Sequence, residues 1–353
     1  MNELIDQAVQ AGLATFKYPL TTVTARAYGL YRGWCINIRP VLEAHDVIEV
    51  ESEFAFPLLN PETEAASKTF VEAGKIDGVL RCKTSGAYKV LEHKTTSDSI
   101  EPESDYWARL VMDTQISKYL LSLRQRGIDA RTVVYDVVKK PAHRGTSIPI
   151  LDENGLKVVR DIHGNRMMTK DGKKWRQTAD TDLGYVVDAR EETPEELASR
   201  VFDAVINDSG AYYVQKEIPR SDTELLEYMS DAWAFSQQIL HYRRQNIWPR
   251  NPSACTQFGT CEFFDLCAKR ADVDGIRYRA KSKAHAELVM EKSGDLELLT
   301  NSRLSALRKC SRYHYLKYES PTERVGEESE ALAIGTAFHH AAEAFLRIFV
   351  VSQ

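Results

Sequence analysis

Residues 76–95, which read IDGVLRCKTSGAYKVLEHKT, carry the clearest structural signal of the chain. Two runs rich in β-branched and aromatic residues flank the turn signal KTSG (83–86), a pattern that predicts a β-hairpin. A two-residue loop TS sets Asp77 opposite Glu92, whereas a loop SG sets Asp77 opposite Lys94. Because side chains alternate along a strand, both registers place Asp77, Glu92 and Lys94 on one face.

These three side chains suggest a specific chemistry. Facing carboxylates repel each other unless a cation lies between them. Oxygen ligands with room for water suit Mg²⁺ or Mn²⁺. Such an ion polarises a phosphate and acidifies a bound water, and Lys94 would orient that water or stabilise developing charge. The hairpin therefore has the residues for phosphodiester hydrolysis; the alternative is a salt-bridged surface hairpin that binds nothing.

The composition is that of an ordinary soluble protein. The 353 residues are 43% apolar and 27% charged, which excludes wholesale disorder and allows two domains or one enlarged domain with a helical annex. No apolar run approaches a membrane span, and MNELIDQAVQ lacks the regions of a signal peptide, so we expect a cytoplasmic location and no membrane partner. Six cysteines in a cytosolic protein are expected to be reduced or metal-bound. The net charge of −5 argues against a generally basic nucleic-acid surface.

The order of apolar patterns predicts an α/β chain with a mixed sheet. The expected elements are helices at 1–45, 104–126, 193–207 and 221–245, strands at 47–56, 68–82, 86–94, 132–138 and 211–218, a polar insertion at 141–180, a cysteine segment at 255–267, a helical connector at 270–298, and a helical pair at 303–318 and 331–349. The expected segments are a helical segment 1–45, a core 46–250, a cysteine segment 251–269, a connector 270–300 and a helical module 301–353.

The helix after the hairpin carries Gln115 and Tyr119, which lie four residues apart and project from one face. Gln115 can hold a phosphate or a water, and Tyr119 can donate a hydrogen bond or stack on a base. The alternative is that Tyr119 is a half-buried structural residue and Gln115 a surface residue.

These residues together resemble a known family. The resemblance rests on Asp77, Glu92-His93-Lys94 and Gln115-x-x-x-Tyr119. This set is similar to the PD-(D/E)XK nuclease superfamily, specifically its RecB-like exonucleases, and implies a restriction-endonuclease-like core with a mixed central sheet and flanking helices. It also implies that the Asp and the Glu ligate the metal, that His93 lends its backbone carbonyl, that the Lys assists the nucleophile, and that the Gln and the Tyr support the site.

The segment NPSACTQFGTCEFFDLC carries Cys255, Cys261 and Cys267, with five residues between neighbours. Structural zinc sites usually contain a tight Cys-x2–4-Cys pair, which this spacing lacks. Three thiolates plus a distant fourth fit a [4Fe–4S] cluster. The alternatives are a zinc-stabilised segment and three small buried residues.

The C-terminal region resembles the opening helical module of the same iron–sulfur nucleases, which include AddB-type, CRISPR-adaptation and phage recombination enzymes. The resemblance rests on SRLSALRKCSRYHYLKY (302–318) and ALAIGTAFHHAAEAFL (331–346). It implies that Cys310 is the fourth cluster ligand and that His339, from Gly-x-x-x-His, is an active-site metal ligand. The secondary expectations are that Glu343 orients His339, His340 is structural, Cys82 is a packing residue, and Cys35 packs or is the second choice for the fourth ligand.

The order of the segments departs from the family, because this module normally precedes the core. Three accounts are open: a circular permutant with residues 1 and 353 near each other, a core whose tail serves a neighbouring copy, and a reading frame that spans the junction of a circular or tandem sequence. We prefer the permutant, since helices at 1–45 would continue from the His339 helix.

The resemblance implies a Mg²⁺- or Mn²⁺-dependent deoxyribonuclease, an exonuclease of recombination, repair or phage DNA metabolism. It implies DNA as substrate and a helicase or a single-strand annealing protein as partner. The cluster would be structural. The alternative function is a nuclease-like protein that binds DNA without cleaving it.

Overall fold

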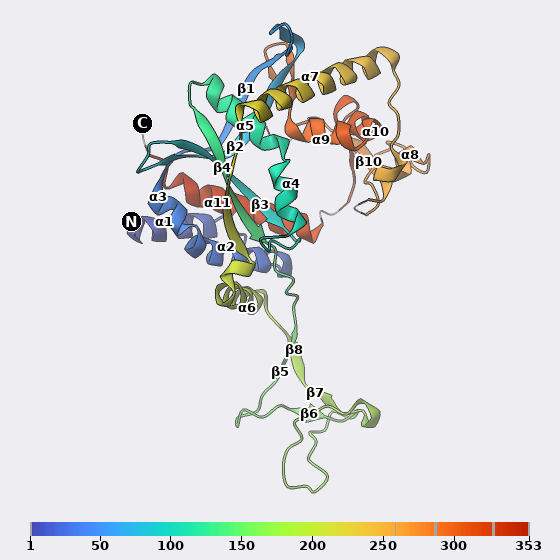
Figure 1. Ribbon diagram of the computed structural model, residues 1–353. Coiled ribbons are helices and arrows are strands. Elements are labelled where there is room, and N and C mark those ends of the chain that lie inside the picture. The colour runs from blue at the N-terminus through green and yellow to red at the C-terminus, as the bar shows by residue number, and fades with distance from the viewer. Residues whose placement is uncertain (1, 258, 286–287, 327–328, 352–353) are drawn as a thin grey trace.

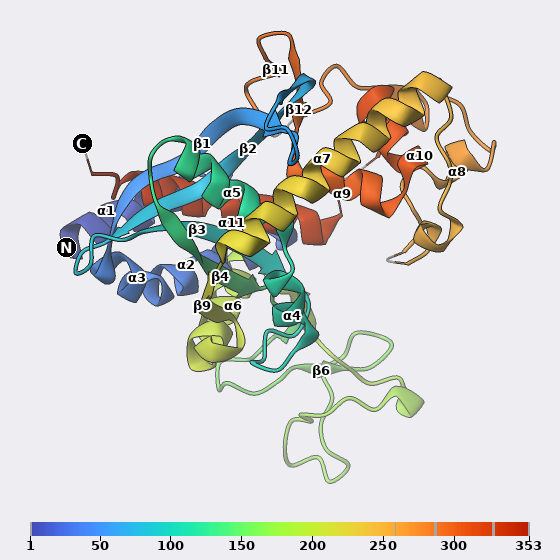
Figure 2. The ribbon, with the colours of Figure 1, turned by 45° about the horizontal axis from the view of Figure 1, so that its top comes forward.

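The computed structural model describes residues 2–257, 259–285, 288–326 and 329–351. A mixed seven-stranded sheet lies between helices on both faces, so the predicted α/β architecture with a mixed central sheet is confirmed (Figures 1 and 2). Its strands are β1 (His45–Leu59), β2 (Ala66–Cys82), β3 (Tyr88–Thr96), β4 (Ala130–Lys139), β9 (Tyr213–Pro219), β11 (Lys292–Ser293) and β12 (Leu296–Leu299). They follow the order β11-β12-β2-β3-β4-β9, and β1 also pairs with β2.

Side chains that alternate along the central strands build two separate cores, as a period of two requires. One face packs against α4 (Asp105–Val111), α5 (Thr114–Gln125), α7 (Asp222–Gln245) and α9 (Asn301–Lys309). The other face packs against α1 (Asn2–Leu13), α2 (Thr22–Asn37), α3 (Arg39–Ala44), α6 (Pro194–Asn207) and α11 (Glu330–Arg347). On β3, for example, Val90 faces the first core and Leu91 the second.

The hairpin adopts the first of the two predicted registers. Gly78 pairs with Leu91 and Arg81 with Tyr88, a register that sets Asp77 opposite Glu92. The loop is nevertheless longer than two residues, because the Cys82 amide already donates to the carbonyl of Ala87 at 2.9 Å. Gly86, with φ of +73°, supplies the left-handed residue that closes this loop.

One edge of β2 is interrupted, and this gap is what positions the site. β1 pairs along nearly the whole of β2, so β3 and β12 must share the opposite edge. The pairing with β3 covers residues 78–81, and the parallel pairing with β12 covers residues 70–72. Residues 73–77 therefore have no strand beside them on that edge in the described sheet.

Two expectations about helices were wrong. The helix expected at 104–126 is two helices, because the Asp113 carboxylate accepts from the amide of Gln115 at 2.9 Å and starts α5 there. The helix expected at 303–318 is likewise divided at Cys310, into α9, α10 (Ser311–His314) and the π-helical turn η4 (Tyr315–Glu319). In both cases one continuous apolar period concealed a break.

The connector at 270–298 was expected to be helical and is instead extended. It contains β10 (Tyr278–Ala280), β11 and β12, and β10 pairs with β13 (Thr322–Arg324). Gly275 and Gly294 have φ values of +83° and +62° and make turns that a helix would not allow. The open edge of β2 supplies a partner for β12, and this pairing outweighs the local helix preference.

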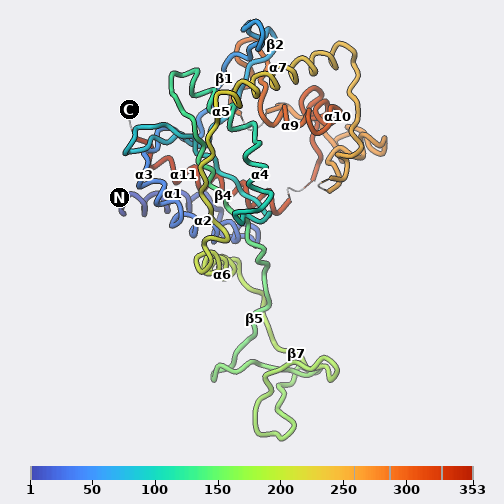
Figure 3. The backbone as a smooth tube through the Cα atoms, viewed as in Figure 1, coloured from blue at the N-terminus to red at the C-terminus, as the bar shows by residue number. Residues whose placement is uncertain are grey.

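The polar insertion forms an arm that extends away from the body next to α6 (Figures 1 and 3). The predicted short strands are present, and the arm reaches beyond residue 180 to Glu191. Its strands are β5 (Ser147–Pro149), β6 (Val159–Arg160), β7 (Val186–Val187) and β8 (Ala189–Glu191), and its helical turn is η1 (Thr181–Leu183). β5 pairs with β8 and β6 with β7, each antiparallel.

The first and last helices of the chain pack together. α11 contacts both α1 and α2, and Val350 forms an isolated parallel bridge with Val47 at the start of β1 (Figure 1). Residues 1 and 353, which we expected to lie near each other, are outside the described residues. None of the described helices is both long enough and apolar enough to cross a lipid bilayer.

A buried ion pair joins α5 to β2. Lys118 is fully buried, and its Nζ lies 2.6 Å from Oε2 of Glu72, which also accepts from the hydroxyl of Tyr228. Replacing Lys118 with methionine leaves the Glu72 carboxylate without a counter-charge, so we expect the free energy of unfolding to fall by about 3–5 kcal/mol. Urea denaturation measures this change. The double variant Lys118→Met/Glu72→Leu should recover most of the loss, and a single variant as stable as the wild type would contradict the prediction.

Candidate active site

The site begins where the two strands of the hairpin separate. Beyond the Gly78–Leu91 pair the amide of His93 donates to Oδ2 of Asp77 at 2.9 Å, in place of a ladder bond. Asp77 is thereby fixed at the open edge of β2, and Glu92 lies across from it on β3. The structure therefore brings together the two carboxylates of the sequence motif.

Lys94 is held between both sides of the site. Its Nζ lies 2.6 Å from Oε1 of Glu92, donates to Oε1 of Gln115 at 2.9 Å and lies 3.8 Å from Oδ2 of Asp113. Burial opposes its charge, but Glu92 and Asp113 outweigh burial and raise the pKa of Lys94. The ammonium group is therefore charged and fixed in place.

Glu92 has the most perturbed carboxylate of the site. Burial, with the nearby charge of Asp77 as the second cause, raises the pKa of Glu92 to about 8, although Lys94 opposes the shift. Oε2 of Glu92 is buried and has no hydrogen-bond partner among the described residues. A buried carboxylate oxygen without a partner is costly, and a cation next to it would remove that cost.

The helix α5 supports Lys94 from the opposite side. The amide of Gln115 donates to the hydroxyl of Tyr119 in a short hydrogen bond, while its oxygen accepts from Lys94. Tyr119 is buried, and burial followed by the charge of Glu92 raises its pKa well above the ordinary value. Asp113 was not predicted from the sequence, although an Asp two residues before Gln115 is a recognisable N-cap signal.

A second group that the motif did not reveal lies below His93. Nδ1 of His93 is 2.8 Å from Oδ2 of Asp136, which also accepts from Nε1 of Trp34 at 2.6 Å, while Oδ1 accepts from Gln215 at 2.7 Å. Asp136 is fully buried. Burial of His93 lowers the pKa of its imidazole, but the hydrogen bond and the charge of Asp136 outweigh this effect and raise that pKa. Nε2 of His93 is buried, and no residue that the structure describes forms a hydrogen bond with it. The only signal for Asp136 was a lone acid in the apolar strand TVVYDVV.

Helix α11 brings His339 to this region from the other end of the chain. Its ring lies 6.3 Å from the ring of His93, centroid to centroid. Burial, opposed by Asp77, lowers the pKa of His339 to about 4, so its imidazole is neutral near pH 7. Gly335 allows this approach, because a Cβ there would lie 3.0 Å from Oγ1 of Thr95 on β3.

The neighbours of His339 differ from the expectation. Glu343 was expected to orient His339, but its Oε1 pairs with Nη2 of Arg347 at 2.7 Å. His340 is exposed. On the other side of Asp77, Glu51 and Lys75 form a close ion pair. Burial is the main cause of the raised pKa of Glu51, and the charges of Asp77 and Glu343 add to it.

A hollow of about 490 Å³ opens beside these residues at the gap in β2. Its wall is formed by Lys75 on β2, Gln115 and Tyr119 on α5, Lys281 of the connector and Lys317 of the module. No described carboxylate forms an ion pair with Lys281 or Lys317. The hollow is therefore positively charged and continuous with the residues that hold Lys94.

Four of the six free cysteines line one small cavity of about 30 Å³. They are Cys255, Cys261, Cys267 and Cys310. The structure thus gathers the four cysteines that the sequence singled out, whereas Cys35 is buried in the α2 core and Cys82 lies near the hairpin loop.

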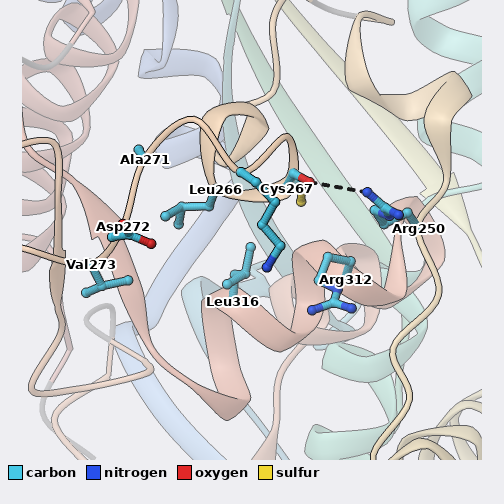
Figure 4. A pocket seen from close by; sticks show the side chains of 9 residues that line it. Arg250, Leu266, Cys267, Ala271, Asp272, Val273, Arg312 and Leu316 are labelled. Carbon is cyan, nitrogen blue, oxygen red and sulfur yellow. Dashed lines mark hydrogen bonds between the residues drawn. The ribbon is translucent and has the colours of Figure 1, made fainter.

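The surroundings of the cysteines suit an anionic group. Arg250 and Lys309 line the cavity, and the amide of Asn251 donates to Sγ of Cys310 at 3.3 Å. Burial raises the pKa of Cys267, so its thiol is neutral without a ligand. Cys267 also borders a larger hollow of about 260 Å³ with Arg312, where Arg250 donates to its carbonyl (Figure 4).

Neither group is a finished metal site. Across the described ranges, no three or more His, Cys, Asp or Glu side chains are arranged closely enough to hold a metal ion. The carboxylates, His339 and the four thiols are thus neighbours whose side chains would have to move to coordinate a metal.

The raised pKa of Glu92 predicts that the metal-free protein loses stability as the pH rises from about 4.5 to about 8. The folded protein keeps a proton on Glu92 between its ordinary pKa of 4.5 and about 8, whereas the unfolded chain releases it. The stabilisation is complete below the ordinary pKa and falls by up to about 1.4 kcal/mol per pH unit until the folded pKa is passed. Thermal melts in EDTA across this range measure the loss. Glu92→Gln cannot ionise and should show a flatter profile; equal profiles would contradict the prediction.

No family model, no curated protein and no solved structure matches this chain.

Proposed function

We propose that this protein is a metal-dependent DNA nuclease, of the exonuclease type, with a PD-(D/E)XK core. The observation that carries the proposal is the pair Asp77 and Glu92 at an open sheet edge, with Lys94 fixed between Glu92 and Gln115. Paired carboxylates beside a charged lysine serve phosphodiester hydrolysis, and the positively charged hollow next to them suits a phosphate chain.

The residues present fit a divalent cation. Asp77, Glu92, His339 and the carbonyl of His93 would hold Mg²⁺ or Mn²⁺; the unpaired Oε2 of Glu92 and the neutral imidazole of His339 support this assignment. The ion, when bound, would supply Lewis-acid polarisation of the phosphate and lower the pKa of a water.

The protein's own residues would position the reactants. Lys94 holds its positive charge where negative charge would develop on the phosphate. Its ammonium group has three N–H donors, and the one that is directed at neither Glu92 nor Gln115 can orient a water by a hydrogen bond. Gln115 fixes Lys94, and Tyr119 fixes Gln115. Lys281 and Lys317 would bind phosphates of the strand on either side of the scissile bond.

The four cysteines would hold a structural [4Fe–4S] cluster, which requires four thiolates. The neighbouring cations Arg250 and Lys309 would compensate the negative charge of that cluster. The cluster would join the cysteine segment to α9 and α10. It would thereby also stabilise the wall of the hollow that carries Lys317.

The order of the segments is consistent with a circular permutant that completes its site in one chain. α11 lies against α1, α2 and β1, and its His339 is beside His93 of the same chain. A tail that served a neighbouring copy would not need these contacts. The pathway proposals remain recombination, repair or phage DNA metabolism, with a helicase or a single-strand annealing protein as partner.

The test is cleavage of linear DNA by the purified protein with Mn²⁺ or Mg²⁺, with EDTA as control. The nuclease proposal expects metal-dependent degradation. Binding of DNA with no cleavage at any concentration of either ion would support the non-cleaving alternative. A colourless protein with stoichiometric zinc would replace the iron–sulfur proposal with the zinc alternative.

A further inference from the structure

The arm, which is the polar insertion from residue 141 to Glu191, has no role in the proposed site. It leaves the sheet after β4, whose Asp136 pairs with His93 and whose Lys139 pairs with Thr96. β3 and β4 are parallel, so the arm starts at the same end of the sheet as Glu92 and Lys94. From there it extends away from the body in every view of the ribbon (Figures 1 and 2).

The shape of the arm is maintained by arginine–carboxylate pairs. Each arginine between β5 and β8 has such a partner: Arg160 with Asp188, Arg166 with Asp152, Arg176 with Asp180 and Arg190 with Glu196. Two of them also stack on aromatic rings, Arg166 at 4.3 Å from the centroid of Trp175 and Arg176 at 5.0 Å from that of Tyr185. Three of these arginine charges are therefore paired within the arm, and the fourth, that of Arg190, is paired with α6.

The lysines of the arm are in the opposite situation. A tight hairpin is closed by the bridge between Met168 and Trp175, and its loop presents Lys170, Lys173 and Lys174. All three are exposed, and no described carboxylate pairs with them. The one acid of the loop, Asp171, is also exposed; it accepts from the hydroxyl of Thr169 and the amide of Lys173, and three lysines to one acid leave the loop with an excess of positive charge.

We infer that this lysine loop binds the phosphate backbone of DNA outside the catalytic hollow. The inference rests on the proposed function for the identity of the polymer. Three exposed ammonium groups on one hairpin can each pair with a backbone phosphate, while the arginine–carboxylate pairs stabilise the arm that carries the hairpin. Since the arm and the carboxylates leave the sheet at the same end, one DNA molecule could contact both.

The experiment compares the affinity of the full-length protein for a labelled duplex of about 30 base pairs over a range of salt concentrations. Fluorescence anisotropy is measured in EDTA, so that no cleavage occurs. For K170A/K173A/K174A we expect at least about a tenfold loss of affinity near 100 mM salt and a dependence of log K on log [salt] that is less steep by about 2–3. The matched control K17A/K68A/K292A also removes three exposed lysines, but from the body. It should lower the affinity by no more than a few-fold and change the salt slope by no more than about one.

A second assay separates this inference from the nuclease proposal. Cleavage of a short oligonucleotide with Mn²⁺ should be the same for the arm variant and the wild type, because the arm lies outside the hollow. A wild type that binds DNA through the arm but never cleaves would refute the nuclease proposal and leave this inference standing. The inference is overturned if the arm variant keeps the wild-type salt slope, if the control loses as much affinity, or if the wild type does not bind DNA.

The arm also exposes apolar side chains, among them Ile162 at 77% and Leu151 at 55%. A contact between two copies through these side chains is the competing use of the arm. It would appear as a concentration-dependent increase in mass by light scattering, with DNA affinity unaffected by the lysine substitutions. That combination would also overturn the inference.

Discussion

Replacing Lys94 with alanine is expected to slow Mn²⁺-dependent DNA cleavage by at least about 100-fold while DNA binding is retained. Lys94 is the only cation whose Nζ contacts both Glu92 and Gln115 among the described residues, at 2.6 and 2.9 Å. Its charge is stabilised by Glu92 and Asp113 against the effect of burial. A fixed charge needs no reorganisation when negative charge develops on the phosphate, and alanine removes it entirely. Initial rates on a labelled linear duplex measure the effect.

The matched control is Lys89→Ala. Lys89 lies on the same strand, but its Nζ pairs with Glu217 at 2.7 Å and not with Asp77 or Glu92. This variant should keep the wild-type rate within a few-fold. A Lys94→Ala protein that cleaves as fast as the wild type would remove Lys94 from the mechanism, and unchanged thermal stability of both variants would exclude misfolding as the cause of a loss.

Replacing Cys310 with alanine is expected to abolish the visible absorbance and the bound iron, and to lower the melting temperature sharply. Cys310 lies between α9 and α10 and shares its cavity with three cysteines of a separate segment. Structural metal sites contribute on the order of 10 kcal/mol to folding, and a cluster with three thiolates is held less firmly. Iron content and thermal melts under anaerobic conditions measure both effects.

Cys82→Ala is the control for this experiment, because Cys82 is a thiol outside the cavity, next to Thr84 in the hairpin loop. It should retain the absorbance and the iron. A Cys310→Ala protein with full iron content would assign the fourth position to another ligand. Cys35 is then a poor replacement, since it is buried within the helical core of α2.

The local parts of the site were predictable from the sequence because neighbouring residues determine them. The turn signal and the alternation of side chains are sufficient to place Asp77, Glu92 and Lys94 on one face in either register, and the structure adopts the register that sets Asp77 opposite Glu92. The spacing of Gln115 and Tyr119 likewise predicts that they share one helix face, and in the structure they form a hydrogen bond there. The predicted helices were wrong where one apolar period spans a break between two helices, as at Asp113 and Cys310. Periodicity indicates which residues are buried, but it does not show whether a helix is continuous.

Contacts between distant segments could not be derived from local pattern. Asp136 became the partner of His93 only when β4 paired with β3, and β12 became a strand only because β2 offers an open edge. The gap that this leaves at residues 73–77 creates the hollow and its positive wall. Apart from the lone acid of the apolar strand TVVYDVV, none of these features has a signal within a window of a few residues.

The hairpin, the shared face of its carboxylates and lysine, and the mixed α/β class follow from local sequence, because strand alternation and turn chemistry act over a few residues. The position of His339 next to His93, the cavity shared by four cysteines, and the paired arginines and exposed lysines of the arm follow from the packing of distant segments. Burial and ion pairing depend on which segments meet in space, and the packing of the whole chain around the sheet determines which ones do.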